Sequence, residues 1–212
     1  MEKIFSIRGL EIHVRYPGNP GPCIYAYVHQ RYTGLCLSRE NLVWVSISNN
    51  NYEEDFTPYP HPPVFRNGIP FSGKADSYLH TLMEIQKAAE TSAYAPSNRI
   101  LAGYSLGGLF SLYATSKTDS FDRVCAASAS FWYPGFVDYV KQHEFHFQKA
   151  SFSIGDKESQ TKNPFLSKSE EAMLQVKELL ESTNHEISFR RMNGGHFQNT
   201  EQRLMDGIRI LL

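Results

Sequence analysis

The sequence predicts a single α/β domain in which helices cover both faces of a mostly parallel sheet. Its 212 residues are 41% hydrophobic and 20% charged, which is the size and composition of one ordinary folded domain. Runs of β-type residues dominate the chain up to residue 48, and helix-type and strand-type segments alternate from residue 75 onward. Strands separated by helices pair in parallel through right-handed crossovers. No internal repeat, low-complexity tract or linker interrupts this pattern, so one domain is expected over 1–212.

Four short runs of apolar, β-branched and aromatic residues predict strands in the first part of the chain. They cover 4–8, 10–16, 23–28 and 42–48, and the last two suit buried strands. Residues 49–74 contain many Asn, Pro and Gly and show little periodicity. They predict a long loop, and such loops more often serve a functional site than a core.

Hydrophobic spacing predicts the elements after residue 75. Helices are expected over 76–94, 106–116, 166–182 and 200–212, with a short helix within 134–147. Strands are expected over 99–102, 122–128, 151–154 and 186–191. Between the strand that ends near residue 130 and the one that begins near residue 151, about 20 residues suffice for one helix and its turns. No lid domain is therefore expected over the site.

A glycine-flanked serine joins a predicted strand to a predicted helix, in Gly103-Tyr104-Ser105-Leu106-Gly107. A serine that projects from a sharp strand-to-helix turn can attack an acyl carbon, and the glycines remove Cβ atoms that would clash at such a turn. The bare pattern arises by chance in roughly one sequence of this composition in ten, so the flanking strand and helix carry the argument. They favour Ser105 as a nucleophile over an incidental serine in a glycine-rich turn.

A catalytic serine needs a general base, and one of the eight histidines has the expected position. In this architecture the base lies on a loop after a late strand. His196 follows the last predicted strand in Asn193-Gly194-Gly195-His196, where two glycines permit a tight turn toward the sheet edge. The alternative is a surface loop histidine. His143 and His146 lie three residues apart without matching acidic or cysteine ligands, so no metal and no cofactor are expected.

The acid of such a triad accepts the histidine Nδ1–H and stabilises the imidazolium. It is expected just after the strand before last, where the chain reads Gly155-Asp156-Lys157-Glu158. Many hydrolases place it three residues after a glycine that closes this strand, and that spacing favours Glu158. Asp156 remains the alternative, and the carboxylate that is not the acid would be a solvated loop or helix-capping residue.

The oxyanion of the tetrahedral intermediate needs hydrogen-bond donors beside the nucleophile. One expected donor is the backbone N–H of Leu106, at the start of the helix that follows Ser105. The second is expected from a backbone amide after the third strand, and the Gln30 amide is the candidate.

Tyr104 and Trp132 are the candidate substrate-binding residues, because their rings can pack on apolar surface of a ligand. The cleft is expected to be open, framed by the loop over 49–74 and by Phe131-Trp132-Tyr133. An open, shallow cleft predicts a bulky soluble alcohol part, a short acyl group and no activation at lipid–water interfaces.

Four further segments follow a known pattern in order: Asp55-Phe56-Thr57-Pro58, Ser128-Ala129-Ser130-Phe131-Trp132, Gly155-Asp156-Lys157-Glu158 and Gly194-Gly195-His196. With the serine turn, they resemble the esterase D and enterochelin esterase branch of the α/β-hydrolases, over roughly residues 40–212. The resemblance implies an eight-stranded sheet whose second strand is antiparallel, and hydrolysis of carboxylic esters through an acyl-enzyme. Members act on siderophore trilactones, S-formylglutathione or acylated sugars, and the sequence selects none of these.

The chain departs from that branch after the third strand. The branch carries an Asp-Gly or His-Gly pair there, whereas this chain reads His29-Gln30, with Gly34 as the nearest glycine. The segment between the third and fourth strands is also barely long enough for one or two helix turns. The departure lies at the position from which the second oxyanion donor is expected.

Composition and charge bear on partner and location. With 21 basic and 22 acidic residues the net charge is −1, which gives no reason to expect nucleic acid or an anionic membrane as partner; a small-molecule ester is expected instead. No signal peptide or membrane helix is visible. Three cysteines, Cys23, Cys36 and Cys125, cannot all pair, so a reducing, cytoplasmic location is expected, with Cys125 buried.

The sequence thus predicts a serine esterase that acts on small soluble esters. One alternative is a non-catalytic hydrolase-like binding protein, supported only by the missing glycine at 29–30. Another is an acyltransferase or thioesterase that uses the same triad. A fluorophosphonate separates the binding protein from the enzymes, because it labels only an activated serine, and alcohol acceptors with thioester donors separate the enzymes. The oligomeric state is not indicated.

Overall fold

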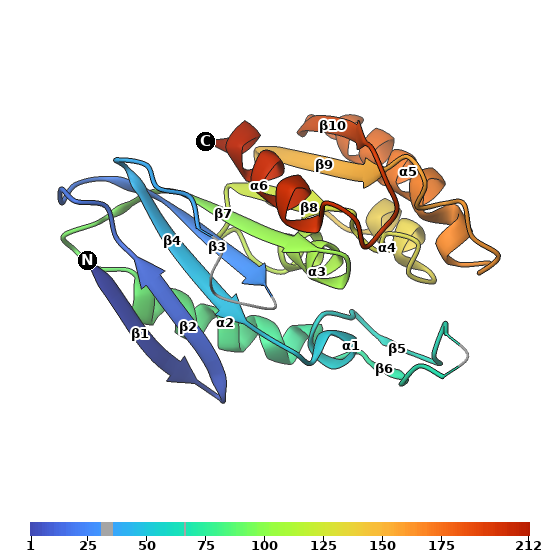
Figure 1. Ribbon diagram of the computed structural model, residues 1–212, viewed down its shortest axis with the longest axis horizontal. Coiled ribbons are helices and arrows are strands. Elements are labelled where there is room, and N and C mark those ends of the chain that lie inside the picture. Colours follow the sequence, from blue (N-terminus) through green and yellow to red (C-terminus); the bar gives the residue numbers. More distant parts are fainter. Residues whose placement is uncertain (31–35, 66) are drawn as a thin grey trace.

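An eight-stranded sheet runs through the centre of the molecule (Figure 1). The computed structural model describes residues 1–30, 36–65 and 67–212. The strands lie in the order β1-β2-β4-β3-β7-β8-β9-β10. Their bounds are Glu2–Ile7 (β1), Leu10–Arg15 (β2), Cys23–Gln30 (β3), Leu42–Ser48 (β4), Pro96–Tyr104 (β7), Arg123–Ala127 (β8), Lys149–Gly155 (β9) and Glu186–Met192 (β10). β2 is antiparallel to β1 and β4, and the other pairs are parallel, as the resemblance implied.

The helices follow the predicted alternation with strands. They are α2 (Ala75–Ala89), α3 (Leu106–Ala114), α4 (Phe136–Gln142), α5 (Ser169–Glu181) and α6 (Thr200–Leu211), with a 3-10 turn, η1 (Leu166–Lys168), before α5. The helix predicted over 76–94 ends at Ala89, because Glu90 takes an extended backbone with ψ of 138°. The segment between β8 and β9 holds only α4, in agreement with the absence of a lid domain there.

The segment over 49–74 is more structured than the predicted loop. It contains a one-turn helix, α1 (Tyr52–Asp55), and two two-residue strands, β5 (Pro60–His61) and β6 (Phe71–Ser72), which pair with each other. Elements this short show no measurable hydrophobic periodicity, so the composition of the segment predicts only a loop.

Each face of the sheet has its own apolar core. On one face α6 packs on β7, β8 and β9, and Leu204, Met205, Ile208 and Leu211 contribute to the core on this face. On the other face α2, α3 and α5 cover the sheet; Figure 1 shows α6 across β7–β9, with α3 behind them. A Cβ on Gly207 would lie 2.6 Å from Cys125 Sγ, so this glycine lets α6 lie directly on β8. Cys125 is fully buried, as predicted.

Parallel strands bring their carboxyl ends to one edge of the sheet, where ligand sites of such folds lie. The segments that follow β7, β8, β9 and β10 meet at this edge, and they carry Ser105, Ser130, Glu158 and His196. Among the helices of the described ranges, none has the length and apolar character that a bilayer crossing needs.

Candidate active site

Ser105 occupies a strained turn between β7 and α3. Its backbone has φ of 57° and ψ of −120°, a region that residues other than glycine rarely adopt. The turn is tight: a Cβ on Gly103 would lie 2.3 Å from the Gly107 carbonyl carbon, and one on Gly108 would lie 2.9 Å from Ala129 Cβ. Glycine is therefore required for the turn that presents the serine.

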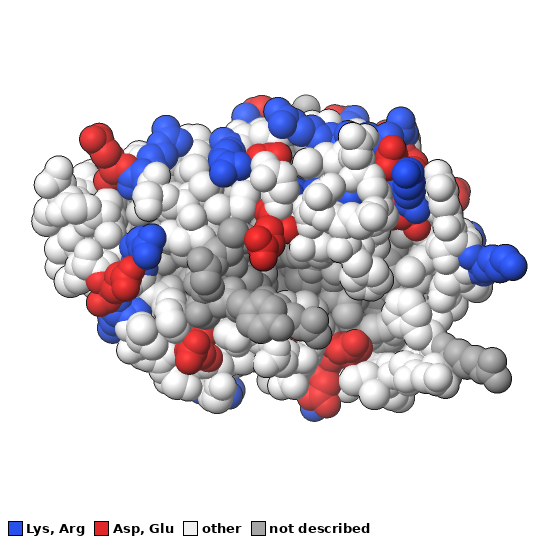
Figure 2. Space-filling view, in the orientation of Figure 1, with Lys and Arg blue, Asp and Glu red and all other residues white. Residues whose placement is uncertain are grey.

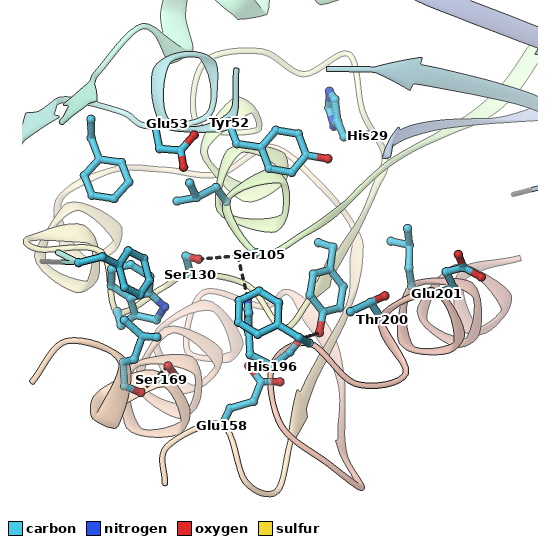
Figure 3. Close-up of a pocket in the computed structure, with 18 residues that line it drawn as sticks. His29, Tyr52, Glu53, Ser105, Ser130, Glu158, Ser169, His196, Thr200 and Glu201 are labelled. Atoms are coloured by element: carbon cyan, nitrogen blue, oxygen red, sulfur yellow. Dashed lines mark hydrogen bonds and ion pairs between the residues drawn. The ribbon is translucent and has the colours of Figure 1, made fainter. Parts of the chain in front are cut away.

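A hydrogen-bond chain runs from Ser105 through His196 to Glu158 (Figure 3). His196 Nε2 lies 3.0 Å from Ser105 Oγ, and His196 Nδ1 lies 2.7 Å from Glu158 Oε2. In the neutral imidazole, Nδ1–H donates to the carboxylate and Nε2 accepts from the serine hydroxyl. The structure thus brings together the three residues that the sequence singled out as nucleophile, base and acid.

The carboxylate of Glu158 is buried and heavily hydrogen-bonded. Its Oε1 accepts from the Gly155 N–H at 2.6 Å, from Ser128 Oγ at 2.7 Å and from Arg203 Nη1 at 2.7 Å. Burial raises the pKa of Glu158, but hydrogen bonds from His196, the Gly155 amide and Ser128 outweigh burial, so the pKa lies below its ordinary value. Glu158 is therefore an ionised carboxylate at neutral pH.

Asp156, the alternative acid, has a different place. Its Oδ1 accepts from the Gly194 N–H at 2.8 Å, so it braces the loop that carries His196. The geometry pairs the imidazole with Glu158, in line with the glycine spacing.

The segments that carry the two predicted oxyanion donors meet at the serine turn. Leu106 is the first residue of α3 and lines the cavity, and first-turn N–H groups have no partner within their own helix. Gln30 is the last residue of β3, whose end is close to the turn because a Cβ on Gly107 would lie 3.6 Å from His29 Cβ. The Gln30 side chain and residues 31–35 lie outside the described part, and the donor role of both amides stays a prediction.

A cavity of about 780 Å³ opens over the triad. Its described lining is mainly apolar and aromatic, with Ser105, Ser130 and His196 at the floor and Glu53 on the opposite wall (Figure 3). Figure 2 shows a hollow in this face with acidic side chains near it. Among the described residues, no group of three or more His, Cys, Asp or Glu side chains is placed to hold a metal ion.

Tyr104 and Trp132, the predicted substrate-binding residues, both line the cavity. Tyr104 also donates its hydroxyl to the His196 carbonyl oxygen at 2.6 Å, so it holds the histidine as well. The prediction that Phe131 and Tyr133 frame the mouth is wrong. Both are fully buried: Phe131 stacks with core rings, and the Tyr133 hydroxyl binds the Tyr59 carbonyl.

Other site residues had no prediction from the sequence. Ser130 Oγ lies 3.2 Å from Ser105 Oγ. Phe65 and Phe197 line the mouth, and Phe197 is 86% exposed. Arg203 is fully buried behind Glu158. For Arg203 a signal existed: it lies four residues before Gly207, on the apolar stripe of α6.

Comparisons with known proteins agree with this architecture. No protein-family model matches the chain. An alignment 128 residues long, which covers 57% of the chain, is 26% identical to an uncharacterized protein, YbbA, of Bacillus subtilis, and spans about half (51%) of that relative's length.

Solved structures share the fold over the whole chain. An IroE-like serine hydrolase from Shewanella oneidensis superposes with a TM-score of 0.81 at 18% identity, covering 79% of that chain. The siderophore hydrolase EstA from Aspergillus nidulans gives 0.71 at 19% identity over 92% of its chain. The enterochelin esterase from Shigella flexneri gives 0.68 at 17% identity over 57% of its chain. The chain therefore has the α/β-hydrolase fold, in the form that these hydrolases and esterases share.

Proposed function

We propose that the chain is a serine esterase that hydrolyses carboxylic esters of small, water-soluble molecules. The observation that carries the proposal is the hydrogen-bond chain from Ser105 through His196 to Glu158, open to a cavity of about 780 Å³. A nucleophile within reach of a base, with that base oriented by a buried carboxylate, is the arrangement that acyl transfer needs.

In the acylation step, Ser105 Oγ attacks the ester carbonyl carbon while its proton passes to His196 Nε2. The Leu106 N–H, with the Gln30 amide as second donor, stabilises the negative charge on the carbonyl oxygen. The tetrahedral intermediate collapses when the bond to the alcohol oxygen breaks. The departing alkoxide takes the proton from His196, and the acyl group remains on Ser105.

In the deacylation step, water attacks the acyl carbon and gives a proton to His196 Nε2. The bond to Ser105 Oγ breaks, the serine recovers the proton and the carboxylic acid leaves. Glu158 stays ionised throughout and stabilises the imidazolium in both steps. Its lowered pKa supports this role.

The cavity supports a bulky ester as substrate. Its volume of about 780 Å³ is within the range that holds a drug-sized ligand, and Phe65, Trp132 and Phe197 offer it apolar and aromatic surface. Two of the structural relatives are named for siderophores or enterochelin and act as hydrolases or esterases. Siderophore-type esters with a short acyl group are therefore the first substrate class to test.

The test is hydrolysis by the purified protein of a panel of soluble esters that vary in acyl length and in the bulk of the alcohol, with mass-spectrometric product analysis. We expect saturable hydrolysis that falls by on the order of 10³-fold or more in Ser105→Ala. Added alcohol acceptors and thioester donors run in parallel. Full hydrolysis by Ser105→Ala would contradict the proposal, and acyl transfer that outpaces hydrolysis would make the protein an acyltransferase.

A further inference from the structure

Arg203 on α6 is a guanidinium with 0% exposure. Removal of a charge from water is costly unless the group is paired and hydrogen-bonded, and hydrophobic residues can often replace a whole buried ion pair without loss of stability. Core packing of α6 alone therefore gives no reason for an arginine at this position, and its partners supply one.

The guanidinium binds three segments of the site. Nη1 donates to Glu158 Oε1 at 2.7 Å and lies 3.1 Å from both Ser128 Oγ and the Tyr104 hydroxyl. Nη2 donates to the Asn193 carbonyl at 2.9 Å. Glu158 is the acid, Asn193 begins the loop that carries the histidine, and Tyr104 precedes the nucleophile.

The two carboxylate oxygens of Glu158 have different hydrogen-bond partners. Its Oε1 accepts from Arg203, Ser128 and the Gly155 amide, whereas Oε2 accepts from His196. Three donors on one oxygen fix the plane of the carboxylate, and the other oxygen is left for the imidazole.

Gly155 makes room for this arrangement. A Cβ at this position would lie 2.5 Å from Arg203 Nη2 and 2.1 Å from the Gly194 carbonyl oxygen. The sequence favoured Glu158 as the acid because a glycine lies three residues before it. In the structure, the missing side chain of this glycine leaves the space that the guanidinium and the histidine loop occupy.

We propose that Arg203 is a positioning residue that fixes Glu158 and the His196 loop and limits how strongly the carboxylate favours the protonated imidazole. The inference rests on the proposed esterase function. A carboxylate beside an imidazole stabilises the imidazolium, and a positive charge on the same carboxylate offsets that effect. Arg203 thus counteracts part of the effect of the Glu158 charge on the imidazole.

Other charged and titratable groups surround the imidazole. Tyr104 at the end of β7, Glu53 on α1 and Glu201 on α6 line the same cavity, and Asp156 binds the histidine loop. All of them remain in an Arg203 variant, so a change in the His196 titration between the variant and the native protein reports on the arginine.

The experiment compares Arg203→Met and Arg203→Lys with a matched control, Arg99→Met, which removes the arginine of the Glu90 ion pair far from the triad. NMR follows the titration of the His196 ring, and ester hydrolysis gives kcat and KM against pH. In Arg203→Met we expect kcat to fall about 10- to 100-fold with little change in KM, and the His196 midpoint and the acid limb of kcat/KM to rise by about one pH unit. Arg203→Lys keeps the charge, so its midpoint stays near the native value while kcat falls. Arg99→Met leaves both unchanged.

A double-mutant cycle separates positioning from general support of the fold. In a Glu158→Gln background, Arg203→Met should cost less than about threefold more, because its partner is already neutral. Losses that multiply, or an unchanged His196 midpoint in folded Arg203→Met, would overturn the inference. If Arg203→Met does not fold, native kcat in Arg203→Lys would overturn it. The NMR titration needs no substrate, so a native protein that hydrolyses no ester contradicts the proposed function and leaves this test intact.

Discussion

The sheet carries a glutamate–arginine pair near each end of β7, and the two pairs differ in how the carboxylate is shared. Arg99 binds both oxygens of Glu90, with Nε to Oε1 at 2.6 Å and Nη2 to Oε2 at 2.9 Å. Arg203 binds only Oε1 of Glu158 and leaves Oε2 to His196. The side chains of the first pair are 28% and 18% exposed, those of the second 0% and 3%. The same two residue types thus form a simple ion pair at Glu90, whereas at Glu158 the carboxylate binds both an arginine and an imidazole.

Charge does not distinguish the two glutamates. Burial raises the pKa of Glu90, but hydrogen bonds from Arg99 and Tyr27 outweigh it, so its pKa, like that of Glu158, lies below the ordinary value. A lowered folded-state pKa means stability that is present above the unfolded-state value and lost as the pH falls through the folded-state value. Both glutamates are ionised at neutral pH, so the difference lies in their burial and in how the carboxylate oxygens are shared.

The largest contrast is expected in activity. Glu158→Gln should lower kcat by about 10²- to 10⁴-fold, because the imidazole loses the charge that stabilises its protonated form. Glu90→Gln should leave kcat within about twofold, because the pair does not touch the site. Steady-state kinetics on one ester checks both, and equal losses in the two variants would show that the site needs only an intact fold.

Loss of the Arg99–Glu90 pair, which does not touch the site, is expected to lower stability rather than activity. Arg99→Met leaves Glu90 without its main partner in a half-buried place, so the free energy of unfolding should fall by about 1–3 kcal/mol. Urea denaturation at pH 7 measures the loss. A variant as stable as the native protein would mean that solvent already satisfies Glu90.

Between pH 7 and pH 5, above the range in which the two glutamates titrate, the pH dependence of stability should come from a histidine. Burial lowers the pKa of His29 to about 3, so the unfolded chain binds a proton that the folded chain excludes between about pH 6.5 and pH 3. Stability should therefore decrease as the pH is lowered through this window, with a slope of up to about 1.4 kcal/mol per pH unit from this group. His29→Phe should flatten the loss between pH 7 and pH 5, and Glu90→Gln should not. An unaltered slope in His29→Phe would assign the loss elsewhere.

The smallest effect is expected from the carboxylate next to the acid. Asp156→Asn keeps an oxygen that can accept from the Gly194 N–H, so kcat should stay within about threefold of the native value. The measurement is the same ester assay. A loss as large as that of Glu158→Gln would return Asp156 to the role of acid.

The sequence predicted the parts of the site whose geometry requires particular residues nearby in the chain. The turn at Ser105 requires glycines two residues away, and Glu158, the proposed acid, lies three residues after Gly155, so spacing predicted both positions. Arg203 left a weaker trace, because a charged residue on a helix ordinarily faces solvent. Its burial depends on Gly155 and Asn193, which lie 48 and 10 positions earlier in the chain.

Orientation within aromatic segments was harder to predict than position. Phe131-Trp132-Tyr133 follows β8 as expected, but a run of three rings does not reveal which of them faces the cavity, and only Trp132 does. The helix predicted over 76–94 extends too far, because Glu90 is held in an extended backbone where Arg99 and Tyr27 bind it.

The most direct test of the central claim is covalent labelling of the native protein with a fluorophosphonate, followed by intact-mass measurement and peptide mapping. An activated serine held by His196 and Glu158 should gain one phosphonyl group, on Ser105, and Ser105→Ala should gain none. Glu158→Gln should label far more slowly than Glu90→Gln, which should match the native rate. An unlabelled native protein, or a label that persists in Ser105→Ala, would contradict the assignment of Ser105 as the nucleophile.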